Sequence, residues 1–324
     1  MTTVRRQITS GRAIVAVISV TASVLLSAAQ ERPSVTALEV AAYRAIGAKH
    51  PDPAIRNSDR VAERLLGPEE RKILDEAGAA VVLAALAMET EAAWDSLGTR
   101  SVFARGVHVR TRHIDDVLSE NLKTGIGQLV ILGAGLDSRA YRFDDALRNV
   151  RVFELDLPRT QAYKKTRVRE VFGDLPRHVT YVPIDFAKQS LDDVLGPAGY
   201  DRTKKTLFIW EGVTMYIPEA AVDATLRAIV RNAAPGSQLV FDYFLDSALK
   251  ARASVLQEVA KNVAAIGEPF VFGMAGQDAS TFVQARGLKV VSDFGSADLG
   301  ARYLPKKYSM PTPSANRVCT AVRP

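Results

Sequence analysis

Two glycines and an aspartate are spaced as a nucleoside-binding site requires. The apolar run 129–132 ends at Gly133 and Gly135, where the backbone can turn tightly and approach a ligand. Asp156 follows 21 residues after Gly135, at the end of a second apolar run, 150–156. A carboxylate at that spacing can accept hydrogen bonds from both ribose hydroxyls of an adenosine group. The pattern predicts a strand, a Gly-x-Gly turn and a helix.

A third apolar run, 179–184, ends in an acid and an aromatic residue, Asp185 and Phe186. The carboxylate can accept hydrogen bonds from the exocyclic amine of an adenine, and the ring offers it a stacking face. Asp185 also precedes a turn, so a helix-capping role remains open.

The residues of the turn discriminate between nucleotides. A P-loop is excluded, because no Gly-Lys-Ser/Thr follows a glycine loop. A nicotinamide dinucleotide favours a third small residue, glycine or alanine, where this chain has Ser138. Asp137, within the turn, would repel a pyrophosphate and would suit a ligand with a positive amino group, such as S-adenosylmethionine. An NAD(P)-dependent oxidoreductase is the alternative enzyme.

The elements that position these residues are those of an α/β protein. A fourth apolar strand, 206–210, presents Glu211 at its carboxyl end, where open parallel sheets bind ligands. Further strands and intervening helices predict a seven-stranded, mostly parallel sheet with helices on both faces. The remaining strands are expected at 238–244, 288–294 and 317–322, and helices at 159–172, 219–234 and 279–286.

A helical layer precedes the sheet. Helices are expected over 33–49, 79–88 and 100–122, which makes residues 31–124 a helical cap and 125–324 a Rossmann-like core. Residues 245–273 read as a helical insertion in that core. Whether the cap lines the mouth of the site or only covers the sheet stays open at this stage.

Composition narrows the function classes. The 324 residues carry a net charge of +6, but the lysines and arginines are scattered among acids, so we expect no nucleic-acid partner. A single cysteine, Cys319, excludes an intramolecular disulfide. The four histidines are spread without metal-ligand spacing, so we expect no metal site.

Residues 1–30 have a different character. They contain three arginines and no acid, followed by an apolar stretch from Ala13 to Ala29. This layout is typical of a secretory signal or a short membrane anchor. The alternative is a segment outside the fold of a cytoplasmic catalytic domain, in which case membrane contact would occur only through residues 1–30.

Four ordered motifs carry a family resemblance. The chain resembles the leucine carboxyl methyltransferase-like family of S-adenosylmethionine-dependent methyltransferases, in particular its actinobacterial branch, over about residues 33 to 322. The motifs are Leu132-Gly-Ala-Gly-Leu-Asp-Ser-Arg-Ala-Tyr-Arg142, Phe153-Glu-Leu-Asp-Leu-Pro158, Val182-Pro-Ile-Asp-Phe186 and Trp210-Glu-Gly-Val-Thr-Met-Tyr216.

The resemblance implies a class I methyltransferase fold and assigns roles to the residues already singled out. Gly133 and Gly135 would shape the pocket for the methionine end of the cofactor. Asp156 would hold the ribose, and Asp185 with Phe186 would contact the adenine.

Two further roles concern the ends of the cofactor and the acceptor. Arg112, or alternatively Arg110, would pair with the cofactor carboxylate, because a guanidinium suits a bidentate contact. Glu211 would face the cofactor amino group or the substrate.

Methyl transfer from a sulfonium to an oxygen needs alignment and a dry site more than it needs side-chain chemistry. A small-molecule carboxylate would need no general base, whereas a hydroxyl would need one, for which Glu211, Tyr216 or a histidine are candidates. Methylation of base amino groups is disfavoured, because Glu211-Gly212 replaces the Pro-Pro-Tyr/Phe motif of such enzymes. A non-catalytic S-adenosylmethionine-binding protein is a further alternative, and no oligomeric state is predicted.

Overall fold

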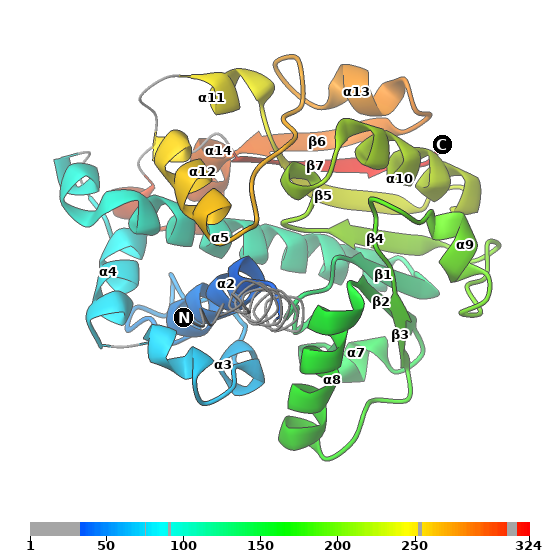
Figure 1. The fold of residues 1–324 in the computed structure, drawn as a ribbon, viewed down its shortest axis with the longest axis horizontal. Coiled ribbons are helices and arrows are strands. Elements are labelled where there is room, and N and C mark those ends of the chain that lie inside the picture. The colour runs from blue at the N-terminus through cyan, green and yellow to red at the C-terminus, as the bar shows by residue number, and fades with distance from the viewer. Residues whose placement is uncertain (1–32, 75, 90–91, 252–254, 310–315) are drawn as a thin grey trace, which may run out of the picture.

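One seven-stranded sheet organises the chain, in the order β3-β2-β1-β4-β5-β7-β6 (Figure 1). β1 to β5 pair in parallel, and β7 is antiparallel to both β5 and β6. The seven-stranded, mostly parallel sheet expected from the sequence is confirmed. The strands are β1 Gln128–Leu132, β2 Arg151–Asp156, β3 Val179–Pro183, β4 Thr206–Trp210, β5 Gln238–Phe244, β6 Lys289–Gly295 and β7 Asn316–Val322.

The computed structural model describes residues 33–324 except 75, 90–91, 252–254 and 310–315. The signal-like or anchor-like segment expected at 1–30 lies outside the described residues. Within the described ranges, no helix combines the length and apolarity needed to cross a membrane.

Burial explains which apolar runs became central strands. Every residue of β1 and of β4 is buried, as expected where helices cover both faces of a parallel sheet. The edge strands β3 and β6 are only partly buried. β6 also has an irregular register between Val290 and Ser292, a feature that discourages pairing of an exposed edge with another chain.

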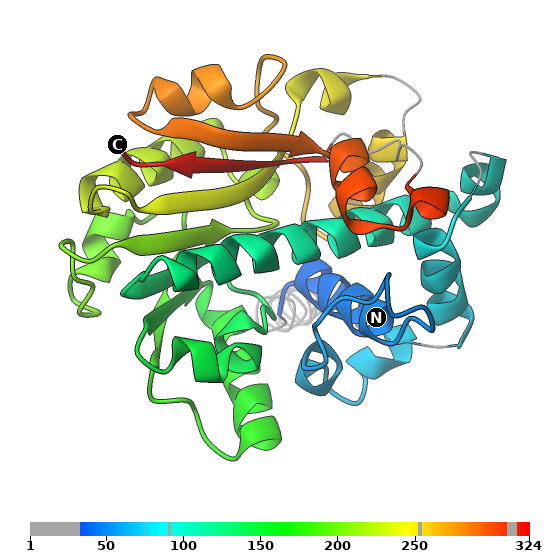
Figure 2. The ribbon, with the colours of Figure 1, turned by 180° about the vertical axis from the view of Figure 1, so that it is seen from behind.

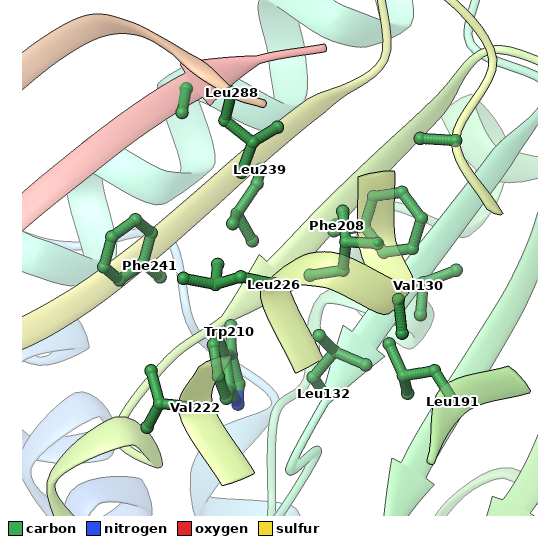
Figure 3. Close-up of a cluster of buried hydrophobic side chains, with 14 of the residues drawn as sticks. Val130, Leu132, Leu191, Phe208, Trp210, Val222, Leu226, Leu239, Phe241 and Leu288 are labelled. Carbon is green, nitrogen blue, oxygen red and sulfur yellow. The ribbon is translucent and has the colours of Figure 1, made fainter. Parts of the chain in front are cut away.

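Helices cover both faces of the sheet. On one face, Val222 and Leu226 of α10 lie against Leu132, Trp210 and Leu239 of the strands (Figure 3). Each fully buried side chain of this size contributes about 1.5–3 kcal/mol. The helices of this face are α9 Leu191–Leu195, α10 Glu219–Asn232 and α13 Ser280–Gln284.

The opposite face is crossed by one long helix, α5, Ala92–Lys123 (Figure 2). Its Val109, Ile114 and Leu118 belong to the same buried cluster as Leu129 of β1 and Leu207 of β4. The other helices of this face are α6 Arg139–Arg142, α7 Asp144–Leu147, α8 Pro158–Phe172 and α14 Ser296–Tyr303.

Residues before the sheet form a layer of helices, in agreement with the expected helices. The helix expected over 100–122 begins earlier, at Ala92. Ser96, Gly98 and Thr99 are weak helix formers, so local preference alone does not predict this extension. Tertiary packing can override such a preference, and α5 as a whole packs on α4. The elements of this layer are α2 Val35–Ala48, α3 Ala62–Leu65, the 3-10 helix η1 Glu70–Leu74, α4 Glu76–Leu86 and the first part of α5.

The stretch 245–273 contains two short helices, α11 Asp246–Lys250 and α12 Val255–Ala265, followed by a returning loop. That loop is anchored to the 3-10 helix η2, Thr214–Tyr216, because the backbone N–H of Val271 donates to the carbonyl of Met215 at 2.8 Å. A further 3-10 helix, η3, spans Lys306–Tyr308.

A buried ion pair joins β2 to α8. Lys164 Nζ lies 2.8 Å from Glu154 Oε2, and both side chains are 1% exposed. Tyr141 also donates to Glu154 at 3.1 Å, while Lys164 donates to the carbonyl of Ala134 at 3.3 Å. Burial raises the pKa of Glu154 to about 7, although Lys164 opposes this shift.

We predict that Glu154→Gln flattens the dependence of thermal stability on pH. A carboxyl whose folded-state pKa is raised destabilises the fold as the pH rises from its ordinary pKa of 4.5 to its folded-state pKa of about 7, because only the unfolded chain gives up the proton in that range. The wild-type protein should therefore lose up to about 1.4 kcal/mol of stability per pH unit between these two values relative to the variant, and no more above them. Thermal denaturation at a series of pH values that spans this range measures the difference.

The control is Glu120→Gln, which alters an exposed pair with Lys123. This control should keep the wild-type slope. An equal slope in wild type and Glu154→Gln would contradict the prediction.

Candidate active site

A cavity of about 350 Å³ lies at the carboxyl ends of β1 to β4. The helices α2 and α5 and the loop after α12 complete its wall. The cap layer therefore lines the site as well as covering the sheet. The lining includes Gly133, Gly135, Asp137, Asp156, Asp185, Phe186, Glu211 and Tyr216, which are all the predicted site residues except Arg112.

The turn after β1 depends on its two glycines. Gly133 and Gly135 have φ of 67° and 42°, in the left-handed region that favours glycine. A Cβ on Gly133 would lie 2.2 Å from Cγ2 of Val213, and one on Gly135 would lie 3.2 Å from the Cβ of Ala37. Neither position has room for a side chain, so both glycines line the cavity with backbone alone, which allows close approach of a ligand.

Asp156 lies directly beneath this turn. Its Oδ2 accepts a hydrogen bond from the N–H of Gly135, and its Oδ1 accepts one from Leu157 at 2.6 Å. Burial raises the pKa of Asp156, an effect that these two N–H groups and Lys164 oppose. Because a carboxylate has about four lone-pair sites, each oxygen can still accept one more hydrogen bond from a ligand.

Asp185 and Phe186 follow β3 on the same rim of the cavity. Asp185 Oδ1 accepts from the N–H of Ala187 at 3.0 Å, and its Oδ2 lies 2.9 Å from Lys188 Nζ. Asp185 therefore caps a turn, whereas the helix-capping role left open by the sequence is wrong, because Ser190 is the N-cap of the next helix, α9. The Phe186 ring lies 6.4 Å from that of Trp210, with its partly buried side chain against the strand cluster.

Glu211 lies between two arginines under the cavity. Its Oε1 is 2.8 Å from Arg110 Nε, and its Oε2 is 2.7 Å from Arg139 Nη1. Burial alone would raise the pKa of Glu211, but Arg139 and Arg110 lower it to about 2. Glu211 is consequently an anion at neutral pH and a weak base.

The two arginines connect further carboxylates into one buried network. Arg139 also lies 2.5 Å from Asp137 Oδ2 and 2.8 Å from Asp115 Oδ1. Burial by itself would raise the pKa of Asp137, but the positive charges of Arg139, Arg44 and Lys164 together lower it.

Arg110 pairs in addition with Asp242 of β5. Asp242 Oδ1 accepts a hydrogen bond from the N–H of Gly212 at 2.5 Å, directly after Glu211. The ionic network, defined as Arg110, Arg139, Asp115, Asp137, Glu211 and Asp242, thus joins α5, the turn after β1, the loop after β4 and β5.

Arg112 has a different position from the one expected. It is absent from the lining of the cavity, and its Nη1 donates to the carbonyls of Ala54 and Ile55 at 2.9 and 3.3 Å and to that of Tyr303. The physical reason is the pitch of α5, since residues two apart lie on different sides of a helix. The role expected for Arg112 has no geometric support, and Arg110 is the arginine of this pair that lines the cavity.

Among the cavity-lining residues that sequence reasoning missed are two charged groups of the outer layer. Arg44 of α2 donates to the carbonyl of Leu136 at 2.7 Å and pairs with Asp59 at 3.1 Å. Arg44 follows Val40 by four residues, so the two side chains lie on the same face of α2. This spacing was the sequence signal that could have placed Arg44 on the cavity side.

Glu268 was missed as well. It accepts hydrogen bonds from the N–H groups of Val35 and Thr36 at 2.9 and 3.1 Å, and from the hydroxyls of Ser34 and Thr36. It joins the loop after α12 to the start of α2, and no local motif indicates such a long-range contact.

Tyr216 lines the cavity close to these groups. Burial raises the pKa of its phenol, while a hydrogen bond with Thr36 lowers it. None of the histidines lines the cavity in the described part of the chain. Burial lowers the pKa of His108 to about 3 and that of His113 to about 4.

The described lining is negative overall. It contains five carboxylates and three arginines. The ionic network pairs some of these carboxylates with arginines. Such a lining favours a ligand of positive charge over a pyrophosphate. The acids are Asp137, Asp156, Asp185, Glu211 and Glu268, and the arginines are Arg44, Arg110 and Arg159.

Comparisons with a family model and with curated relatives point to the same family of methyltransferases. A family model described as leucine carboxyl methyltransferase matches residues 37–230. YktD of Bacillus subtilis, provisionally named an S-adenosyl-L-methionine-dependent methyltransferase, is 31% identical over 192 residues, or 59% of this chain and 63% of YktD. A Mycobacteroides abscessus protein with the same provisional name is 35% identical over 209 residues, or 64% of this chain and 65% of that protein. The chain spans slightly less than two thirds of the length of these curated relatives.

Solved structures share the fold. A DUF574 family protein from Streptomyces avermitilis superposes with a TM-score of 0.53 at 14% identity, and the superposition covers 86% of this chain and 100% of that protein. A provisionally named methyltransferase from Thermobifida fusca gives the same TM-score, 0.53, at 14% identity, covering 90% of this chain and 96% of the other.

We predict that Gly133→Ala destabilises the protein more than Gly125→Ala does. Both glycines have positive φ, so both variants incur the left-handed strain of about 1–2 kcal/mol. Only at Gly133 does the new methyl meet Val213, whereas nothing lies within 4 Å of it at Gly125. The β-branched Val213 cannot easily turn away.

The overpacking should cost about 1–3 kcal/mol more at Gly133 than at Gly125, measured as free energy of unfolding in urea. Equal losses in the two variants would show that the contact with Val213 is readily relieved.

Proposed function

Because the chain belongs to the leucine carboxyl methyltransferase family, we propose that it transfers the methyl group of S-adenosylmethionine to a carboxylate of a small molecule. The observation that carries the choice of carboxylate is the absence of a suitable general base from the described lining of the cavity. Glu211 is held ionised by two arginines, and the pKa of the Tyr216 phenol is raised. A hydroxyl acceptor would need such a base, whereas a carboxylate is already a nucleophile.

The residues present fit the cofactor. The bare turn at Gly133 and Gly135 allows close approach, and each oxygen of Asp156 has a free lone pair for a ribose hydroxyl. Asp185 and Phe186 are on the rim where an adenine would follow the ribose. These features support the roles that the family resemblance implies for them.

The charged ends of the cofactor also find partners. Arg110 uses its Nε and Nη1 for Glu211 and Asp242, and a guanidinium has five N–H donors, so it can still donate to a carboxylate. Asp137 and Glu211 supply the negative charge that suits an ammonium group. We therefore assign the cofactor carboxylate to Arg110 instead of Arg112.

When bound, S-adenosylmethionine supplies an electrophilic methyl group on a sulfonium. The protein orients the cofactor and the acceptor and excludes water from the site. Anions that are already fixed under the cavity help to hold the positively charged cofactor. Because its positive charge disperses during transfer, alignment and exclusion of water supply the rate. Glu211 acts in this scheme as a fixed charge and takes no proton.

We predict that Asp156→Ala weakens binding of S-adenosylmethionine at least about tenfold, the loss expected for a buried charged acceptor. Isothermal titration calorimetry measures the affinity. Asp145→Ala removes a carboxylate whose side chain is 93% exposed, and it should bind like wild type. Unchanged binding by Asp156→Ala would refute the ribose role, and binding of NAD in place of S-adenosylmethionine would refute the proposed function.

The product should be a methyl ester. With tritiated methyl donor, radioactivity transferred to a small carboxylic acid should be released as volatile methanol on mild alkali. Because the described lining contains no group expected to act as a base near neutrality, kcat/KM should vary less than about threefold between pH 6.5 and 8.5. An alkali-stable product, formed at a rate that rises tenfold per pH unit, would indicate a hydroxyl acceptor.

A further inference from the structure

The cavity has a second half that the cofactor contacts do not use. We call it the aromatic half, defined by Val40, Phe103, Tyr216, Phe244 and Phe270. These residues come from α2, α5, η2, the end of β5 and the loop after α12. Both α2 and α12 pack against α5, which brings these segments together (Figure 1).

Three rings form a continuous surface in this half. The Phe270 ring centroid lies 5.3 Å from that of Tyr216 and 5.1 Å from that of Phe244, with planes tilted by 55° and 50°. Met215 and Leu256 belong to the same hydrophobic cluster as these rings. Val40 and Phe103 pack on a neighbouring cluster around Tyr43.

The charged groups bordering this half are already engaged. Glu268 accepts hydrogen bonds from two backbone N–H groups and two hydroxyls at the start of α2. Arg110 is held by Glu211 and Asp242, and its remaining donors are assigned above to the cofactor carboxylate. A ligand that carried a second charge into this half would lose hydration without gaining an ionic partner among the five residues that define it, which is costly.

Glu268 also fixes the position of Phe270, two residues further along the loop. The contact of Val271 with the carbonyl of Met215 anchors the other side of the same segment. Phe270 is therefore held over the cavity from both sides, so the rings form a preorganised wall.

We propose that the aromatic half is the acceptor subsite and that its occupant is a monocarboxylic acid with an aryl or similarly flat apolar body. This inference rests on the proposed function. The acceptor's single carboxylate points toward the strand-end half, where the cofactor methyl group would be, and its ring lies among Tyr216, Phe244 and Phe270. Edge and offset contacts between rings add stability beyond the burial of apolar area.

The test uses the full chain saturated with S-adenosylhomocysteine and three acids: 3-phenylpropanoate, hexanoate and glutarate. Affinities are measured by calorimetry, so the result does not depend on turnover. We expect 3-phenylpropanoate to bind at least tenfold more tightly than hexanoate, and glutarate to bind at least a hundredfold more weakly than 3-phenylpropanoate. Equal or tighter binding of glutarate would overturn the inference.

Variants at two phenylalanines separate ring contacts from folding. Phe270→Leu keeps an apolar side chain but removes the ring, and it should weaken 3-phenylpropanoate binding at least fivefold. Its affinity for S-adenosylhomocysteine should stay within twofold of wild type, which reports an intact fold. Phe172→Leu, at a ring outside the cavity that is 40% exposed, should match wild type for both ligands.

The outcomes distinguish this inference from the proposed function. If S-adenosylhomocysteine does not bind, both fail. If it binds and 3-phenylpropanoate does not, or if Phe270→Leu and Phe172→Leu behave alike, only the aromatic subsite fails. If 3-phenylpropanoate binds as expected and alkali-stable products form from aryl alcohols, the subsite stands and the carboxylate acceptor is wrong.

Discussion

The buried ionic network under the cavity is the interaction on which the site depends. Arg110 and Arg139 each hold Glu211, and through Asp242, Asp137 and Asp115 they join α5 to the sheet. Removing one partner from a buried pair leaves an uncompensated charge, which is strongly destabilising. This network therefore fixes the strand ends, the glycine turn and the cap relative to one another, and a substitution of any one of its charged residues should destabilise the protein.

The same network determines which chemistry is available. Ion pairing keeps Glu211 ionised and removes it as a base, while leaving its charge facing the cavity. A lining with five acids and three arginines suits a sulfonium cofactor with a single carboxylate better than it suits a pyrophosphate. Because Glu211 takes no proton, the proposed carboxylate acceptor has the advantage that it needs no base.

The outer wall follows a different principle. Rings from η2, β5 and the loop after α12 form its apolar surface, and Glu268 ties that loop to the start of α2. The proposed cofactor contacts thus come from strand ends, which parallel α/β sheets share. The proposed acceptor surface combines the end of β5 and η2 with residues of the cap and of the insertion.

The sequence by itself determined the sheet, the glycine turn and the acids at the strand ends. Apolar runs buried on both faces, and residues directly after them, are local features of the chain. Only the tertiary structure decided between Arg110 and Arg112, and it alone revealed Arg44, Asp242 and Glu268 as partners. Those choices depend on the rotation of α5 and on contacts between residues up to 234 apart, such as Ser34 with Glu268, which no local spacing encodes.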